Sequence, residues 1–570
     1  MISSVSQDPV EGAPASPNQT PVYTFRMRRL SPYEATIAAA CILFGFFIRC
    51  VHVGYREITG GEFFTINFIN GERPPFVRSI FEGKLPLYYE FMRVWGGAFG
   101  TQSETVLRLP SVVFGLLACI AFLIYAQRFL RGTAFAVAML AIALNPVLVY
   151  SSIEASSFAL LSLFGIVSNY FCVRALNEGG RKHWSGYAIC AALGALVHPL
   201  FWFLLVAQFI FAASRPRKTP RPFLLVSIGG IILSVIVMIF SAIYANATFP
   251  RKVEPDMPVI DDVAQGIVAV VVGNFSRYGY NEFGQALMYL FILVTLGLSF
   301  YYYWMRSKEA EALPEGVMWI DETQDVVGKW RRLSLASFLL FQWFTFGIPA
   351  FGIMLMGSYA SRVSLHPEYF IVCLPSLLFL VAAGIDAAPG KYGKVSLIAL
   401  FVVFMGFYNA RGLTDKGPGV YELFQRVRKE QFDPSRDVLL YIYSQGIEQA
   451  VDRYSRGIKG IPFSRNLDRR VFLERLDAVT RDRERVFVFY NNDYRTEGRS
   501  RLSLARVWFE QNKDRWLEDE SKSRKIGQIP ETELKVYRRI KYTSEPAATV
   551  PEDLVTSPPD PAEPSSAQQP

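Results

Sequence analysis

Residues 56–111 decide how this chain folds, and they include Gly60-Gly-Glu-Phe-Phe-Thr65, Gly83-Lys-Leu-Pro-Leu-Tyr-Tyr89 and Leu107-Arg-Leu-Pro-Ser111. The segment lies between two apolar runs that are each long enough to cross a bilayer, and it is much longer than a simple helix connection. It also carries a series of glutamates: Glu57, Glu62, Glu72, Glu82, Glu90 and Glu104. Long connections usually carry function, so we expect chemistry at the edge of the membrane here.

The composition places most of the chain in a bilayer. Apolar residues make up 51% of it and charged residues only 19%, whereas a soluble protein of this length would carry more charge. Apolar runs of about 17–25 residues recur up to residue 410, and each can span the hydrocarbon. We predict about eleven spans, near 33–53, 109–127, 133–150, 157–174, 185–197, 199–213, 222–244, 285–305, 333–356, 368–387 and 393–410.

The basic residues follow this topology. If the N-terminus is cytoplasmic, the arginines and lysines before the first span and in the short loops all fall on one side of the membrane, as the positive-inside rule requires. The net charge of +9 is therefore no sign of nucleic-acid binding. The sequence predicts a multi-pass protein of the cytoplasmic (inner) membrane, and a disordered cytoplasmic lead over the Pro- and Ser-rich residues 1–30.

Beyond residue 410 the chain becomes charged and globular. Val438–Tyr443, Val486–Tyr490 and Leu534–Tyr537 have the composition of short strands, and helical spacing occurs at 443–456, 468–482 and 500–516. We therefore predict a membrane domain over 31–410, with a long first outer loop at 54–108, and a small extracytoplasmic α/β domain over 411–543. The Pro-, Ala- and Glu-rich residues 544–570 are expected to be disordered.

Several motifs occur in a defined order along roughly residues 30–440. They are Gly61-Glu62, Leu85–Tyr89, Leu107–Ser111, Tyr150-Ser-Ser-Ile-Glu154-Ala-Ser156, and a late stretch from Arg362 to Pro375 that contains His366 and Tyr369. In this order the chain resembles the polytopic membrane glycosyltransferases of the GT-C fold. It is most similar to the bacterial relatives of protein O-mannosyltransferases and of the lipid A aminoarabinose transferase.

The resemblance implies an inverting glycosyltransferase that uses a sugar linked to polyprenyl phosphate and acts on a lipid, glycan or protein acceptor outside the membrane. Such a reaction needs a carboxylate to take the acceptor's proton and cations to hold the phosphate. Of the two catalytic candidates, Glu62 would serve as the base, and Glu154 would orient the acceptor or assist. Substrate binding would fall to Lys84, Tyr88, Tyr89, Arg108, Arg362 and His366.

One departure from this pattern supports an alternative function. Gly61 stands where the resemblance implies the aspartate that acts as the base, and no aspartate occurs between residues 51 and 100. The alternative is a catalytically degenerate relative, or a protein that binds or transports a lipid-linked glycan. The sequence indicates no metal site, although a divalent metal remains open as a cofactor, and it has no nucleotide-binding glycine loop.

Some of the candidate residues also have simpler interpretations. Glu62 would be an ordinary acid at a helix N-terminus, Arg108 an anchor at the membrane edge, and Tyr88 and Tyr89 packing aromatics. The environment of Glu62 discriminates between the two functions. A transferase needs this carboxylate in a cavity that also reaches Arg362 or His366 and opens to lipid, whereas a solvent-facing Glu62 remote from both would count against the enzyme.

Overall fold

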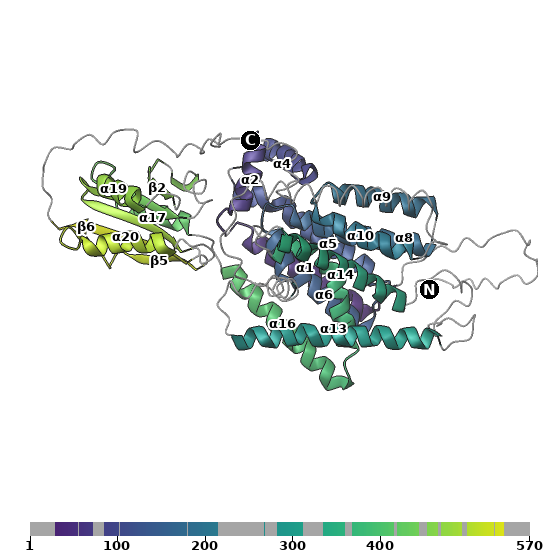
Figure 1. Ribbon diagram of the computed structural model, residues 1–570. Helices are drawn as coiled ribbons and strands as arrows, with labels where there is room; N and C mark the ends of the chain where they lie inside the picture. The colour runs from purple at the N-terminus through teal and green to yellow at the C-terminus, as the bar shows by residue number, and fades with distance from the viewer. Residues whose placement is uncertain are drawn as a thin grey trace, which may run out of the picture.

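The computed structural model describes residues 29–54, 56–71, 85–101, 103–178, 180–214, 267, 282–311, 335–359, 367–414, 419–443, 453–455, 457–464, 469–492, 499–528 and 531–540. They form a bundle of apolar helices with a mixed sheet at one end (Figure 1). The expected disorder at residues 1–28 and 544–570, and the predicted span at 222–244, lie outside the described residues.

Seven predicted spans correspond to helices that are long and apolar enough to cross a membrane. They are α1 (Pro32–His52), α5 (Glu104–Ala126), the pair α6 (Gly132–Leu144) and α7 (Pro146–Ser152), α8 (Phe158–Glu178), α13 (Glu282–Glu311), α14 (Leu335–Tyr359) and α16 (Gly390–Thr414). The predictions at 199–213 and 368–387 became the shorter apolar helices α10 (Leu200–Ala213) and α15 (Leu374–Asp386). The run at 185–197 became α9 (Arg181–Ala195), which has 15 residues and is too short for a straight crossing.

Local sequence signals explain where these helices begin. Ser31 caps α1 by accepting the Glu34 backbone N–H, and Glu34 accepts the Ser31 N–H in return, while Pro32 occupies the first helical position. A second oxygen of Glu34 accepts the Gly132 N–H at the start of α6. One short motif therefore both starts the first span and ties it to the third.

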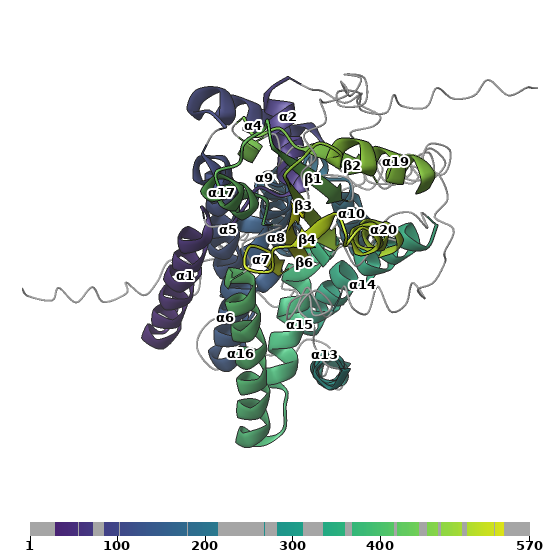
Figure 2. The ribbon, with the colours of Figure 1, turned by 90° about the vertical axis from the view of Figure 1, so that its left-hand side faces the viewer.

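The described residues between α1 and α5 include two short helices, α2 (Gly60–Ile69) and α4 (Pro86–Phe99), which lie at the end of the bundle that faces the sheet (Figures 1 and 2). Tyr89 packs edge-on against Phe64, with ring centroids 5.3 Å apart. Gly96 lies so close to Ile69 that an added Cβ would come within 2.6 Å of its side chain. The glycine therefore allows α2 and α4 to pack closely.

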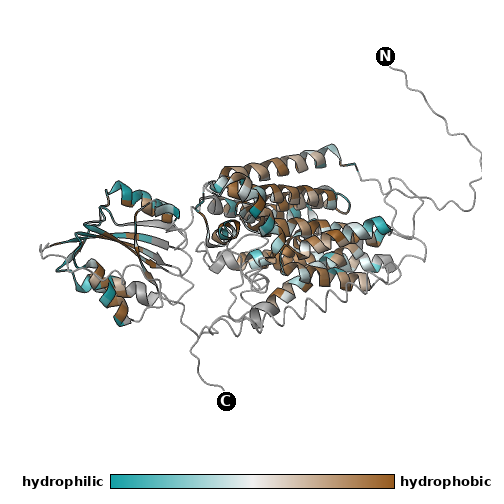
Figure 3. Ribbon diagram, turned by 90° about the horizontal axis from the view of Figure 1, so that it is seen from above, coloured by the Kyte–Doolittle hydropathy of each residue, from teal (hydrophilic) through white to brown (hydrophobic). Residues whose placement is uncertain are grey.

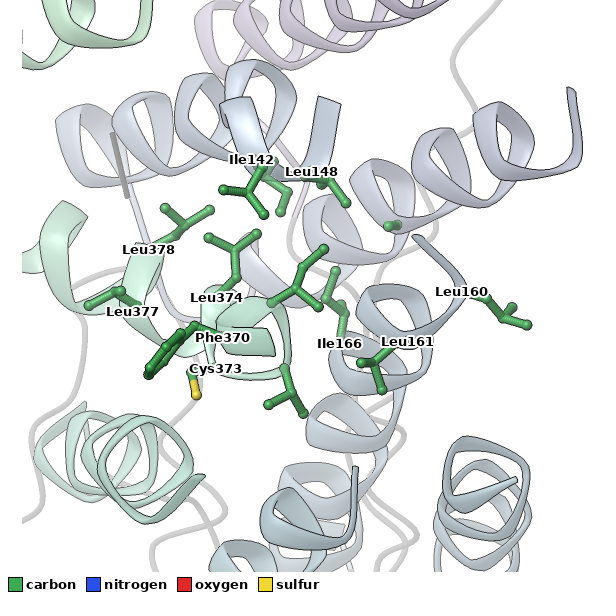
Figure 4. Close-up of a cluster of buried hydrophobic side chains, with 14 of the residues drawn as sticks. Ile142, Leu148, Leu160, Leu161, Ile166, Phe370, Cys373, Leu374, Leu377 and Leu378 are labelled. Atoms are coloured by element: carbon green, nitrogen blue, oxygen red, sulfur yellow. The ribbon is translucent and has the colours of Figure 1, made fainter. Parts of the chain in front are cut away.

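The interior of the bundle is mostly apolar. Figure 4 shows one part of it, where Leu148 of α7, Ile166 of α8 and Leu374 of α15 meet beside η2 (Pro367–Val372). All three side chains are buried. Apolar residues continue along most bundle helices, while polar residues are more frequent on the helices beside the sheet (Figure 3). This core fixes the residues between α7 and α8 relative to η2.

A chain of buried polar side chains also crosses the bundle. Gln208 of α10 accepts a hydrogen bond from Tyr187 of α9 and donates to Asn169 of α8 at 2.7 Å. Asn169 donates to Ser376 of α15 at 3.5 Å, and Ser376 bonds Thr345 of α14 at 2.7 Å. Because no water competes inside a bilayer, such bonds fix the register between helices.

The sheet has the strand order β2-β1-β3-β6-β4, and β5 also pairs with β6. Strands β2 (Ile461–Ser464), β1 (Asp437–Tyr443) and β3 (Arg485–Asn492) are parallel, whereas β6 (Glu531–Arg539) runs antiparallel to β3, β4 (Trp516–Glu518) and β5 (Arg524–Gln528). This is the α/β arrangement that the sequence predicts, with β1, β3 and β6 as its predicted strands.

Alternation along the strands separates two faces. Val438, Leu440 and Val486 face α19 (Arg469–Thr480) and α20 (Arg499–Gln511), which were both predicted as helices. On the opposite face Tyr441 packs against Phe424 of α17 (Val420–Lys429). Of the predicted helix at 443–456, the structure describes residue 443, which instead ends β1, and residues 453–455. Helix α17 joins the sheet to the membrane helices.

Gly384 offers a test of the helix packing. A Cβ at this position in α15 would lie 1.9 Å from the backbone oxygen of Thr295 in α13, and backbone cannot move aside as a side chain can. We expect Gly384→Ala to destabilise the protein by about 1–3 kcal/mol. Gly347→Ala is the matched control, because nothing lies within 4 Å of its added Cβ. The measurement compares the unfolding midpoints of Gly384→Ala and Gly347→Ala in the same detergent. Equal midpoints would contradict the close packing of α15 against α13.

Candidate functional site

Arg108 is the centre of the site, and it is buried in the first turns of α5 with 1% of its side chain exposed. Its Nε and Nη2 donate to the two carboxylate oxygens of Glu62, each at 2.7 Å. The remaining N–H groups donate to the backbone oxygens of Val53 (3.0 Å), Arg56 (2.7 Å) and Glu57 (2.9 Å). All five guanidinium donors are therefore used, and the arginine binds the end of α1 to the start of α2.

The Leu-Arg-Leu-Pro-Ser sequence explains this position of α5. Pro110 has no N–H, so the Val106 oxygen four residues earlier lacks its helical partner. The indole N–H of Trp95 in α4 donates to that oxygen at 2.9 Å. Ser111 bonds the hydroxyl of Tyr88 at 3.3 Å. The motif thus docks α4 on α5 and orients Arg108 toward Glu62.

Glu62 is fully buried and its oxygens are saturated. Besides Arg108, it accepts the backbone N–H groups of Thr59 (2.9 Å) and Ala155 (2.9 Å), so each carboxylate oxygen has two donors. Burial by itself would raise the pKa of Glu62, but the bonds and charge of Arg108 outweigh it and hold that pKa below its ordinary value. Glu62 is therefore a permanent carboxylate without a free lone pair for a proton.

Glu154 lies in the short connection between α7 and α8, next to Ala155. The Thr59 hydroxyl donates to its Oε1 at 2.5 Å. Burial raises the pKa of Glu154 to about 7, the negative charge of Glu62 adds to this effect, and the positive charge of Arg56 opposes it. At neutral pH this carboxyl group can therefore both release and accept a proton, as a general base requires.

Gly61 lies directly beside this carboxyl group. A Cβ at residue 61 would come 3.7 Å from Glu154 Oε1 and 3.9 Å from Thr59 Oγ1, which are ordinary contacts. A side chain at residue 61 and the side chain of Glu154 would therefore meet at the same point. Residue 61, where the resemblance implies an aspartate, is thus adjacent to a carboxylate supplied by a different part of the chain.

Two further charged residues interact electrostatically with Glu154, and the sequence pattern predicts a role for neither. The Arg56 guanidinium lies over the Tyr150 ring, 4.5 Å from its centroid. Glu368 is on η2, which packs against α7 and α8, and its negative charge also raises the pKa of Glu154. Both residues lie close to predicted motifs in the sequence, which could have indicated them. Arg56 precedes the Gly-Gly-Glu motif, and Glu368 follows His366 by two positions.

The other predicted substrate-binding residues fall into two groups. Tyr88 and Tyr89 are buried, with 0% and 6% exposed, and they pack against each other edge-on at 5.3 Å. The Tyr89 ring packs against Phe64 and Phe68 of α2, and the Tyr88 hydroxyl bonds Ser111 of α5. Lys84, Arg362 and His366 lie outside the described residues. Among the residues that the structure does describe, no three His, Cys, Asp or Glu side chains are grouped to hold a metal ion.

Comparisons with known proteins now bear on this geometry. Residues 86–244 match the family model described as dolichyl-phosphate-mannose-protein mannosyltransferase. The matched residues include Tyr88, Tyr89, Arg108 and Glu154 of the site. A comparison with curated proteins gives no match.

Solved structures of low identity are similar over most of the chain. The crystal structure of ArnT from Cupriavidus metallidurans bound to undecaprenyl phosphate is 13% identical over 88% of this chain and 97% of its own, with a TM-score of 0.43. Its apo state is 12% identical over 88% and 98%, with a TM-score of 0.46. The Archaeoglobus fulgidus oligosaccharyltransferase tethered with an acceptor peptide is 10% identical over 84% and 71%, with a TM-score of 0.44.

The family-model match and the helical architecture agree with the order of motifs along the chain. The match begins at Pro86, the first residue of α4, and runs through the Arg108 and Glu154 elements. The resemblance predicted from the sequence is confirmed by this family-model match over residues 86–244, and the described helices have the multi-pass architecture that the sequence predicts.

Proposed function

We propose that this protein transfers a sugar from a polyprenyl-phosphate donor to a lipid, glycan or protein acceptor at the outer face of the cytoplasmic membrane. The observation that carries this proposal is the Glu154 carboxyl group, which combines a pKa of about 7 with a position beside Gly61. A family member without its usual aspartate still has a carboxylate at the same point. The family-model match over residues 86–244 supports the reaction class.

The contacts favour Glu154 as the general base and Glu62 as a positioning residue. An acceptor hydroxyl would lose its proton to Glu154 while its oxygen forms a bond to the anomeric carbon. The bond from that carbon to the phosphate oxygen breaks, and the polyprenyl phosphate leaves with the electron pair. Glu62 has four donors and a lowered pKa, so its role is to hold Thr59 and Ala155 in place around Glu154.

The leaving phosphate needs cations or donors to stabilise its charge. We assign this role to Arg362 and His366, and also to Lys84, from their places in the sequence pattern. Arg108 has no free donor and is therefore not assigned to the phosphate. The proposed orientation has a cytoplasmic N-terminus and an outer sheet region, so that the site opens where lipid-linked sugars are used.

Native mass spectrometry of the protein released gently from its own membrane tests the donor class. We expect a bound polyprenyl phosphate or its glycosylated form, and we expect Arg362→Ala to lose it while Arg93→Ala, an exposed control, retains it. The mass difference between the two lipid forms would identify the sugar. If only bulk phospholipid is bound, while a related transferase keeps its carrier under the same conditions, a polyprenyl-phosphate donor is excluded.

A further inference from the structure

Residues 56–62 form a strap in which successive residues bond to different parts of the protein. The Arg56 side chain lies over Tyr150 of α7, and the backbone N–H of Ile58 donates to the Tyr454 hydroxyl at 3.1 Å. The Thr59 hydroxyl donates to Glu154, and Glu62 pairs with Arg108. The strap therefore contacts the membrane helices at both ends. In its middle it contacts the sheet region, by which we mean the described residues between 419 and 540.

Glu57 joins the strap to the sheet region through both of its carboxylate oxygens. One carboxylate oxygen accepts the Val420 N–H at 2.9 Å and the other accepts the Tyr421 N–H at 2.8 Å. These N–H groups belong to the first turn of α17, where helical donors have no internal partner and the helix dipole favours an anion. Glu57 is buried, with 7% exposed, so water does not replace these bonds.

The backbone of Glu57 belongs to the candidate site at the same time. Its carbonyl oxygen accepts from Arg108 Nη2, the same atom that donates to Glu62. One residue thus joins the first turn of α17 to the arginine that holds Glu62. Two hydrogen bonds through Thr59 connect Glu62 to Glu154. The Thr59 backbone N–H donates to Glu62, and the Thr59 hydroxyl donates to Glu154.

A second set of contacts joins the two parts beside Glu57. The Tyr454 hydroxyl donates to Glu104 at 2.5 Å, and Glu104 is the first residue of α5. Arg453 donates to the Thr101 oxygen at 2.9 Å. The sheet region therefore holds the segment between α1 and α5 near both of its ends, and Arg108 lies one helical turn beyond Glu104.

We propose that Glu57 is a positioning residue, through which the sheet region holds the strap and thereby orients Thr59 against the base Glu154. This inference rests on the proposed function for its catalytic meaning. The sheet region then helps to position the residues of the active site. It is not an independent module that only selects the acceptor.

Hydrogen exchange of the full-length protein in lipid nanodiscs tests the mechanical part. We expect Glu57→Ala to raise exchange at least about tenfold at three places: the first turn of α17, the strap residues 58–62, and Ala155, whose N–H bonds Glu62. Glu57→Gln keeps one acceptor oxygen, enough for one of the two N–H groups, and should retain part of this protection. Glu90→Ala, an exposed glutamate in the same connection, is the matched control and should change nothing beyond α4.

The outcomes separate this inference from the proposed function. If Glu57→Ala exposes only α17 while residues 58–62 and Ala155 stay protected, Glu57 is a simple helix cap and the inference is wrong. If exchange rises at all three places but the wild-type protein transfers no sugar, the coupling stands and the proposed function fails. Where transfer occurs, Glu57→Ala should lower kcat and shift the pH profile, with partial rescue in Glu57→Gln, and an unchanged profile would overturn the positioning role.

Discussion

Replacing Arg108 by alanine should lower the free energy of unfolding by about 3–5 kcal/mol, the largest stability effect that we expect for a single substitution in this protein. The reason is the buried glutamate that remains. Glu62 would keep its charge with two backbone donors but without its cation, and the oxygens of Val53, Arg56 and Glu57 would lose a donor as well. Chemical unfolding in a fixed detergent, followed by tryptophan fluorescence, measures the loss.

Two controls make the Arg108 experiment specific. Arg93→Ala breaks an exposed ion pair with Glu90, which should cost no more than about 1 kcal/mol. Glu62→Ala combined with Arg108→Ala removes both charges, so the pair of changes should cost less than the two single costs added together. Equal losses in Arg93→Ala and Arg108→Ala would show that the Glu62 pair does not hold the site.

Replacing Glu154 by glutamine should lower the rate of sugar transfer at least about 100-fold, because removal of a general base costs about 10²–10⁴ in rate. The folded state should persist, since glutamine can still accept the Thr59 hydrogen bond. Glycosyl transfer is measured in proteoliposomes made with a lipid extract that contains the native lipid-linked sugars. The product is free polyprenyl phosphate, detected by mass spectrometry.

The pH dependence of the wild-type enzyme provides an independent check on this role. A base must be deprotonated, and burial raises the pKa of Glu154 to about 7. The value of kcat/KM should therefore fall about tenfold for each pH unit below 7 and level off above it. A profile that stays flat down to about pH 5, near the ordinary glutamate pKa, would exclude a base in this environment.

The sequence was sufficient for the membrane architecture because the signal for a span is strong. A long apolar run has few alternatives to a helix in a bilayer, so α1, α5, α8, α13, α14 and α16 were predicted from the length and composition of their runs. The β1, β3 and β6 strands were predicted for a similar reason, as buried apolar runs. Strand β4 has only three residues, too few for a strand pattern, and β5 is mostly polar, so composition gives little signal for either.

The candidate site was less predictable because its contacts are long-range. The motif Gly61-Glu62 and the motif around Glu154 were both recognised, yet nothing in either shows that Thr59 reaches Glu154 or that Arg108 takes both Glu62 oxygens. The separate roles of the two glutamates follow from burial and donor count, which exist only in the folded chain. The contact of Glu57 with α17 spans more than 360 residues and had no local signal.

The most direct test of the account restores a carboxylate at the position that lacks one. A Cβ at residue 61 meets Glu154 Oε1 at 3.7 Å without a clash, and an acid is favoured in the first turn of α2. The transfer rates of the wild type, Glu154→Gln, and Glu154→Gln combined with Gly61→Asp are compared in the same lipid extract. We predict that Glu154→Gln transfers sugar at least about 100-fold more slowly than the wild type. The double variant should transfer it at least about tenfold faster than Glu154→Gln. A Glu154→Gln protein that transfers sugar at the wild-type rate would contradict the assignment of Glu154 as the base.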